Sequence, residues 1–296
     1  MFSEKVLKTL FDKVSVSNVG KILNREDDLA KFDSSIIDST PKMSGKLGMP
    51  ALHEIHIFLD NLWFGDASSV DKDIVERYSN VVKNFNEICE GTYENFKLMK
   101  DPLLSLKFEK NGYVNVMQSS LYVLSNNRED VIKMTHQLAE LFASAGFNVL
   151  REKIEASVYG IDGIPQTDEE AVKYGKYFEF HISVQRKNGN NTEPLSNVEL
   201  SGLEKISNKF KILFNTPVPL SFNMNKENSG KAYHRYLNFR TRGKGAINSN
   251  IELQQILDAI EAETDFSVVK TIREYVWYDT YVKLDRGWID FDENTD

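Results

Sequence analysis

The chain has 296 residues, 41% of them hydrophobic and 27% charged, which is the balance of a soluble globular protein with room for two ordinary domains. A formal net charge of −8 excludes nucleic-acid binding through a general positive field, although a local basic patch stays open. One cysteine excludes an internal disulfide, and no apolar run reaches the roughly 20 residues that span a bilayer. The N-terminus lacks the apolar core of a signal peptide, so we expect a cytoplasmic protein without membrane contact.

Residues 1–50 are predicted to form a helix followed by a linker arm. Apolar residues near the N-terminus recur at helical spacing, which predicts an amphipathic helix containing Val6, Leu7, Leu10, Phe11 and Val14. Such a helix packs on its own domain or recruits a protein partner. The polar stretch after it is interrupted by prolines and glycines and is typical of a linker.

From residue 51 onward, the hydrophobic pattern predicts the element order βαββαβ twice. The first pass comprises a strand, a helix, a hairpin, a helix and a strand at 52–63, 70–88, 103–125, 131–146 and 147–158. The second pass has the same elements at 176–187, 197–210, 211–242, 248–264 and 266–282. We therefore predict an α+β protein with two ferredoxin-like lobes, residues 51–160 and 161–296, behind the N-terminal arm.

Two short signatures recur between these lobes. The Glu-x-His sequence that starts at Glu54 recurs at Glu179, an offset of 125 residues, and the Arg-Glu pair at Arg151 recurs at Arg273, an offset of 122. Near-equal offsets for separate signatures predict a tandem duplication.

Strand alternation predicts which of these polar residues share a sheet face. Both helices of a ferredoxin-like lobe cover one face, so apolar positions such as Ile55 face the helices and the intervening residues lie on the open face. The open face is predicted to carry Glu54, His56, Glu179, His181, Arg151, Lys153, Arg273 and Tyr275. Glu152 and Glu274 are predicted to face the helices.

The second lobe has a more basic open face than the first. Tyr236 and Arg240 are expected on its third strand, and the following loop adds Arg242 and Lys244 just before a helix N-terminus. Backbone N–H groups and the helix dipole favour an anion at such a place, often phosphate.

Two histidines brought together by a pseudo-twofold axis suit general acid/base catalysis on a phosphodiester, because imidazole titrates near neutral pH. In this interpretation Glu54 and Glu179 orient His56 and His181. A purely structural interpretation makes Glu54–Arg151 and Glu179–Arg273 cross-strand ion pairs. A third interpretation combines the histidines and glutamates as ligands of a divalent metal ion.

The second of these histidines lies in the sequence His181-Ile182-Ser183. It resembles the His-x-Thr/Ser motif that each lobe of the two-histidine phosphoesterases supplies, in a duplicated α+β fold that acts on cyclic phosphates or phosphodiesters of nucleotides and RNA ends. The equivalent His56-Ile57-Phe58 departs from the motif because it lacks the hydroxyl group. The Asn- and Lys-rich composition also resembles that of large DNA virus or phage proteins.

Our leading hypothesis from the sequence is a metal-independent phosphoesterase, without a cofactor, that acts on a nucleotide or RNA end. His56 and His181 are its predicted acid/base pair. The predicted substrate-binding residues are Glu54, Glu179, Ser183, Tyr236, Arg240, Arg242, Lys244 and Arg273. The alternative is a non-catalytic binding or assembly protein whose paired lobes form the interface for a partner or ligand.

Overall fold

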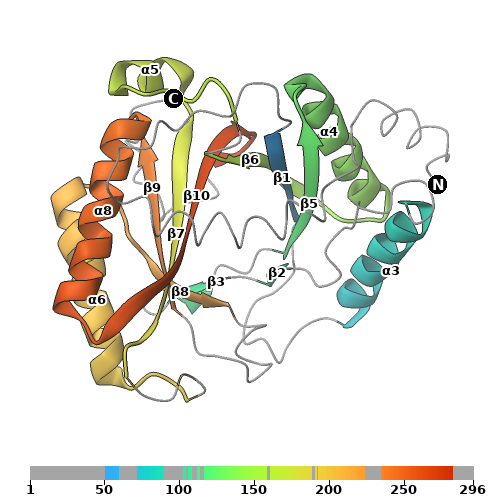
Figure 1. Ribbon diagram of the computed structural model, residues 1–296. Coiled ribbons are helices and arrows are strands. Elements are labelled where there is room, and N and C mark those ends of the chain that lie inside the picture. Colours follow the sequence, from blue (N-terminus) through green and yellow to red (C-terminus); the bar gives the residue numbers. More distant parts are fainter. Residues whose placement is uncertain are drawn as a thin grey trace.

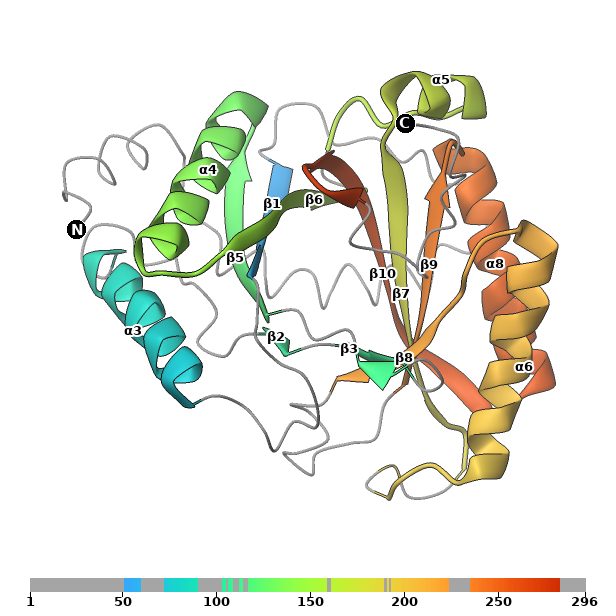
Figure 2. The ribbon, with the colours of Figure 1, turned by 180° about the vertical axis from the view of Figure 1, so that it is seen from behind.

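The computed structural model describes residues 51–59, 72–89, 103–104, 106–108, 112–113, 117–158, 161–188, 191, 193–223 and 235–282. The predicted N-terminal helix and arm, residues 1–50, lie outside the described residues. Strands occupy the middle of the molecule and helices lie on two opposite outer sides (Figure 1; Figure 2 gives the reverse view). Among the described residues, no helix is long and apolar enough to cross a membrane.

The first half of the protein, up to Val158, follows the predicted order except at 103–125, where four strands replace the predicted two-stranded hairpin. Its elements are β1 (Ala51–Leu59), α3 (Lys72–Cys89), β2 (Leu103–Leu104), β3 (Leu106–Phe108), β4 (Gly112–Tyr113), β5 (Met117–Ser125), α4 (Arg128–Ser144) and β6 (Val149–Ser157). Helix α4 packs on β1, β5 and β6, and α3 joins it through Tyr78, whose ring stacks on Phe142 at 5.6 Å.

The second half follows the predicted order after an additional short helix that the hydrophobic pattern did not predict. Its elements are α5 (Asp168–Tyr174), β7 (Tyr177–Arg186), α6 (Asn197–Phe214), β8 (Leu220–Asn223), β9 (Arg235–Arg242), α8 (Ala246–Glu263) and β10 (Phe266–Asp279). Capping boxes start two of the helices, at Thr167 for α5 and at Ser196 for α6.

The ten strands of the described residues belong to one sheet with the order β2-β5-β1-β6-β10-β7-β9-β8-β3-β4. The run β2-β5-β1-β6 of the first half corresponds to β8-β9-β7-β10 of the second, which is the strand order of a ferredoxin-like fold, with β3 and β4 additional. The two last strands, β6 and β10, pair antiparallel and join the halves. The protein is therefore an α+β protein with ferredoxin-like strand order in each half.

The two ends of this sheet also meet. Strand β2 pairs with β5 at one end of the order, whereas β3 pairs with β8 near the other end. Only one residue separates β2 from β3 in the chain, and consecutive Cα atoms are about 3.8 Å apart, so β5 and β8 must approach each other. The sheet curls around an interior, with the helices outside (Figure 1). We call the sheet face opposite the helices the inner face.

The predicted faces of the two central strands are confirmed. Ile55 and Ile57 of β1, and Phe180 and Ile182 of β7, are fully buried in the hydrophobic core. The residues that alternate with them, including His56, therefore lie on the inner face of the sheet.

The predicted faces of β10 were wrong. Arg273 lies opposite Phe180 and Tyr275 opposite Phe178, and directly paired residues of antiparallel strands share a face. Arg273 and Tyr275 thus face the helices, where Tyr275 packs against the Phe178 ring at 5.1 Å. Glu274, which was predicted to face the helices, lies on the inner face.

The error has a physical cause in the register of the last strands. Glu54 lies opposite Glu155 and Glu179 lies opposite Glu274, so Glu274 is the counterpart of Glu155, and the true offset between the last strands is 119 residues. The recurrence of the Arg-Glu pair at an offset of 122 does not mark equivalent positions. Bulges in β10, which is longer than β6, also change the alternation along that strand.

Candidate metal centre

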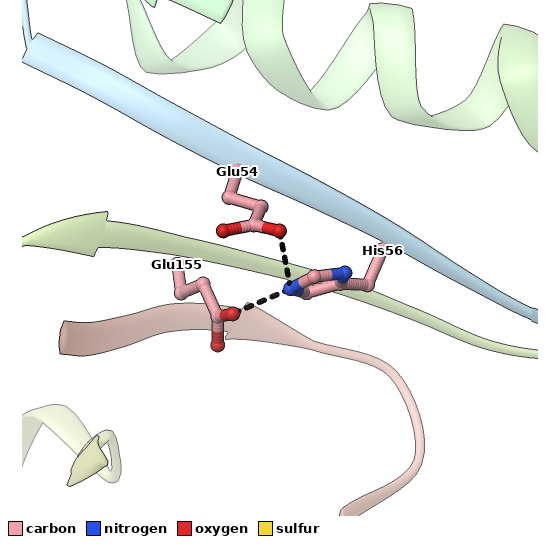
Figure 3. Close-up of side chains that lie close together, drawn as sticks. All are labelled: Glu54, His56 and Glu155. Carbon is pink, nitrogen blue, oxygen red and sulfur yellow. Dashed lines mark hydrogen bonds and ion pairs between the residues drawn. The ribbon is translucent and has the colours of Figure 1, made fainter. Parts of the chain in front are cut away.

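A buried triad on the inner face joins β1 to β6. Glu54 and His56 are two residues apart on β1, and Glu155 lies opposite Glu54 on β6. The His56 Nε2 atom is 2.5 Å from Glu155 Oε1 and 3.5 Å from Glu54 Oε1 (Figure 3). Both carboxylates point at the same ring nitrogen, and one ligand atom from each of the three residues lies within 4.8 Å of the others.

The other ring nitrogen of His56 is held by the neighbouring strand β5. Ser120 lies opposite His56, and its Oγ atom is 2.9 Å from His56 Nδ1, while Gln118 Nε2 lies 2.5 Å from the same nitrogen. The Gln118 amide has two orientations that a hydrogen-bond network must decide between. In the orientation that the structure shows, Gln118 Nε2 donates to Nδ1 and the ring proton lies on Nε2, toward the carboxylates. The flipped amide would accept from Nδ1–H and leave the Nε2 lone pair available to a metal ion.

An equivalent triad occupies the second half. His181 Nε2 is 3.3 Å from Glu179 Oε1 and 3.5 Å from Glu274 Oε2. Asn238 lies opposite His181 as Ser120 lies opposite His56, and its Oδ1 atom is 2.7 Å from His181 Nδ1. In both halves the third strand therefore holds Nδ1 of the histidine and leaves Nε2 facing two carboxylates.

The orientation of the Asn238 amide follows from its own partners. Its Nδ2 group donates to Ser221 Oγ at 2.7 Å and to the Pro219 carbonyl at 3.4 Å. Because a carbonyl can only accept, the Asn238 oxygen faces His181 and takes the Nδ1 proton. His181 Nε2 is the ring nitrogen that faces the two carboxylates.

Two permanent cations connect the triads. Lys153 Nζ lies 2.6 Å from Glu155 Oε2 and 2.6 Å from Glu179 Oε2, so one ammonium group bridges the two halves. Arg240 Nη2 donates to Glu179 Oε1 at 2.5 Å. Tyr122 occupies the position of Arg240 in the first half and gives Glu54 a neutral hydrogen bond. The second triad is therefore better neutralised than the first.

Each triad has one carboxyl group with a raised pKa and one with a lowered pKa. Burial of Glu155 in the first triad is outweighed by the charges of Lys153 and His56, which lower its pKa from 4.5 to about 2. Burial and the charge of Glu155 raise the pKa of Glu54, although the charge of His56 opposes them. Burial raises the pKa of Glu274 well above its usual range, and the charges of Glu155 and Glu54 add to that rise. Burial also acts on Glu179, but the charges of Arg240 and Lys153 outweigh it and hold the pKa of Glu179 well below normal.

The surroundings of His56 favour its charged form. Burial alone would lower the pKa of its imidazole, but the charges of Glu155 and Glu54 outweigh burial and raise it. A proton on Nε2 thus holds the two carboxylates together in the structure, at the point where the three ligand atoms converge.

The donor set suits a divalent ion of the first transition series. One imidazole nitrogen with two carboxylates is a mixed N/O set that fits Zn²⁺, Mn²⁺ or Fe²⁺. With bonds of about 2.0–2.2 Å, two donors on one ion lie about 3–4 Å apart. The Glu54–His56 distance of 3.5 Å fits this range, whereas the 2.5 Å hydrogen bond from His56 to Glu155 must lengthen when an ion replaces the proton.

Several residues of the predicted site share this interior. His56 is only 3% exposed, while the side chain of His181 is 21% exposed. Ser183 is buried on β7 opposite Tyr236 of β9, on the same face as His181. Glu155 was not predicted as a site residue. Its role depends on its pairing with Glu54 across the strands, and this pairing cannot be read from the sequence.

The basic residues predicted to bind phosphate do not gather in one place. Arg240 points inward to Glu179, Arg242 is exposed at the end of β9, and Lys244 pairs with Glu252. The carboxylate of Asp168 occupies the N-terminus of α8, where its Oδ1 atom accepts from the Gly245 N–H at 2.8 Å. Asn248 of α8 donates to the other Asp168 oxygen at 2.8 Å.

The structural ion pairs expected for the arginines also take a different form. Arg151 donates to both carboxylate oxygens of Asp279 and to the Tyr177 hydroxyl, and its guanidinium lies 4.8 Å from the centre of the Phe58 ring. This cluster connects β6 with β7 and β10. Glu179 takes Lys153 and Arg240 as its cations.

No family model matches the chain, and no curated protein matches it. Among solved structures, a heme-binding protein from Thermus thermophilus aligns over 77% of this chain and 91% of its own, at 11% identity and a TM-score of 0.26. A variant of DypB from Rhodococcus jostii RHA1 in complex with heme aligns over 80% and 97%, at 12% identity and a TM-score of 0.24. A dye-decolorizing protein from V. cholerae aligns over 81% and 97%, at 9% identity and a TM-score of 0.22. Scores this low carry no argument about function.

Proposed function

We propose that this protein binds a divalent transition-metal ion between Glu54, His56 and Glu155. The main supporting observation is that four buried or nearly buried carboxyl groups form two directly opposed Glu–Glu pairs on the inner face, with Lys153 bridging the pairs. Like charges that lie directly opposite each other on neighbouring strands destabilise a sheet. Among the described residues, the permanent cations paired with Glu54, Glu155, Glu179 and Glu274 are Lys153 and Arg240.

The charge balance supports a bound cation. Four carboxyl groups outnumber the two permanent cations, and the raised pKa values of Glu54, His56 and Glu274 mean that bound protons offset part of the difference. A divalent ion would take the place of such protons at the first triad. The first triad is the favoured position, because Glu179 of the second triad already pairs with Arg240 and Lys153 whereas Glu54 has the neutral Tyr122. Burial makes an uncompensated charge costly, because it loses its hydration.

Three protein ligands leave coordination positions open. Sites with three protein ligands keep a position for water or substrate, whereas structural zinc sites are closed by four. The proposed centre therefore resembles a catalytic metal site in its donor count. An ion here would act as a Lewis acid on a bound oxygen, and Lys153 would keep Glu155 fixed beside it.

Metal binding is tested by calorimetric titration of EDTA-stripped protein with Zn²⁺, Mn²⁺ and Co²⁺, with Mg²⁺ as the comparison for an oxygen-preferring ion. Visible absorption of the Co²⁺ form reports the donor atoms. We expect saturable binding of a transition-metal ion that is lost in His56→Ala and kept in His136→Ala, a change at an exposed histidine of α4. Wild-type protein that binds none of the ions, or equal binding by His56→Ala, would reject the proposal.

The second candidate is the two-histidine phosphoesterase predicted from the sequence. It is favoured by one observation: His56 and His181 hold equivalent positions on the inner face, and Glu155, Lys153 and Glu179 link them. Its test is hydrolysis of 2′,3′-cyclic, 3′,5′-cyclic and linked dinucleotides with and without EDTA. Turnover that survives EDTA and is lost in His56→Ala and His181→Ala supports it over the metal centre. Folded protein that neither binds metal nor turns over any substrate favours the non-catalytic binding protein.

We also infer that the two halves arose by tandem duplication. The support is positional: the Glu-x-His sequence, the opposed glutamate and the Nδ1 partner of the histidine recur at equivalent places in the same strand order. A separately expressed half that self-associates into the ten-strand arrangement would support this origin. A half that stays monomeric and unfolded would count against it.

A further inference from the structure

We propose that Lys153 and Arg240 together stand in for a second metal ion, so that the protein binds one ion but carries a latent second site at Glu179, His181 and Glu274. This inference rests on the proposed metal site of the first half. It adds the number of metal ions bound per chain, the reason for that number and a second set of ligands.

The second ligand set has the same construction as the first. The Nε2 atom of His181 faces Glu179 at 3.3 Å and Glu274 at 3.5 Å. Asn238 holds the opposite ring nitrogen, in the position that Ser120 takes for His56. Both carboxylates approach the same ring nitrogen, but among the described residues only the first triad brings all three ligand atoms within 4.8 Å of one another, so the carboxylates of the second set must move closer together to hold an ion.

Two cations break the symmetry between the halves. Lys153 lies opposite His56, whereas the residue opposite His181 is Ile272, so the ammonium group is present in one half only. On the third strands, Arg240 lies opposite Glu179 where the first half has Tyr122 opposite Glu54. Both departures direct positive charge at Glu179.

These contacts use the atoms that a second ion would need. Arg240 donates to Glu179 Oε1, which is the oxygen nearest His181, and Lys153 contacts Glu179 Oε2. With both oxygens of Glu179 already paired, a metal ion at His181 has no free oxygen on that residue.

Removing both Lys153 and Arg240 is expected to make the second site available to a metal ion. The four carboxyl groups then lose these permanent cations, and the atoms of the second triad become available. The test is the metal content of wild type and of Lys153→Met/Arg240→Met, both refolded with excess Co²⁺ and desalted, measured by elemental analysis. We expect one ion per chain in wild type and two in the double variant, with a return to one when His181→Ala is added.

The conservative variant Lys153→Arg keeps the charge and is expected to bind one ion. Two ions in wild type, with the second lost in His181→Ala, would overturn the inference because the second site would not be latent. One ion in a folded double variant would overturn it too. If the double variant does not fold, Arg240→Met alone is measured, because it frees the Glu179 oxygen nearest His181, and one ion per chain in that folded variant would overturn the inference. No ion in wild type would instead reject the proposed metal function itself.

Discussion

Glu54 lies directly opposite Glu155 in the ladder that joins β1 to β6, and His56 Nε2 is the group that both carboxylates approach. Such a pair repels itself in a buried sheet unless a positive charge lies between the carboxylates. The two carboxylates raise the pKa of His56 and so favour its positive charge, and a metal ion can take the place of the Nε2 proton.

Replacing one member of this pair is expected to weaken metal binding strongly. Glu155→Gln keeps the size of the side chain but removes the negative charge and one good oxygen donor. We expect the affinity for Zn²⁺ or Co²⁺ to fall by about 100-fold or more, since the loss of outer-shell partners alone costs about 10–100-fold. Calorimetric titration at constant pH measures the change.

The matched control is a nearby residue of the same strand. Glu152 faces α4, where its Oε2 atom lies 2.6 Å from His136 Nδ1, so Glu152→Gln alters the other face of β6. Its metal affinity should equal that of wild type. Equal losses in both variants would mean that the effect comes from β6 as a whole and not from the triad.

A second prediction concerns the residues that orient His56. Gln118 and Ser120 act through the ring and are positioning residues, since they contact Nδ1 while Nε2 faces the carboxylates. The double variant Gln118→Ala/Ser120→Ala should lose about 10–100-fold in metal affinity. The Co²⁺ absorption spectrum should shift as well, because the ring is free to rotate.

Asn238→Ala is the counterpart of this change in the other half. It removes the partner of His181 Nδ1 and should leave the affinity for the first ion unchanged, provided the variant is folded at the temperature of the titration. A loss in Asn238→Ala that matches the loss in the Gln118→Ala/Ser120→Ala variant would place the ion in the second triad.

Local patterns predicted the elements and the faces of the central strands. Ile55 and Ile57 alternate with Glu54 and His56, and only one assignment of faces buries the apolar pair. The start of α4 could also be predicted, because asparagine is a preferred N-cap residue. The Asn127 side chain caps α4 by accepting a hydrogen bond from the Glu129 N–H.

Strand register and contacts between residues far apart in the sequence could not be predicted in the same way. Whether Glu274 faces the helices or the interior depends on its register against β7 and on bulges in β10, neither of which leaves a periodic signal. Glu155 and Lys153 are far along the chain from Glu54 and His56, the residues that they face across the ladder. Closure of the sheet depends on a short segment that pairs at both ends, and strands of two or three residues give little pattern to detect.

A third prediction tests the contact between the loop before α5 and the start of α8. A Cβ atom at Gly245 would lie 2.4 Å from the Gln166 carbonyl oxygen and 2.4 Å from the Thr167 carbonyl carbon. Both are backbone atoms, so the chain itself must move. Gly245→Ala should destabilise the protein by about 1–3 kcal/mol, the range for overpacking. Urea unfolding followed by circular dichroism measures this change.

Gly202 provides the opposite case within a helix. It lies inside α6, and a Cβ atom there meets nothing within 4 Å. Gly202→Ala should stabilise the protein by about 0.5–1 kcal/mol because alanine loses less backbone entropy in a helix. If both alanine variants shift the unfolding midpoint in the same direction, the close approach of backbone atoms at Gly245 does not determine the stability of Gly245→Ala.

A fourth prediction concerns acid stability at the start of α6. Glu199 accepts from Arg186 Nε at 2.5 Å and closes the capping box with Ser196. The hydrogen bond from Arg186, followed by those from Ser196, lowers the pKa of Glu199 from 4.5 to about 2. A carboxyl group with a lowered pKa stabilises the fold above its unfolded value, and this contribution is lost as the pH falls from about 4.5 to about 2.

Glu199→Gln should therefore cost up to about 1 kcal/mol at neutral pH, a modest value because the side chain is 26% exposed and water screens the ion pair. The glutamine can still accept the capping hydrogen bond, so the difference from wild type should shrink to near zero around pH 2. Urea unfolding across this pH range measures the difference, and Glu140→Gln, at an exposed position of α4, should follow the wild-type curve. A constant difference between Glu199→Gln and wild type at every pH would assign the loss to packing and not to the charge.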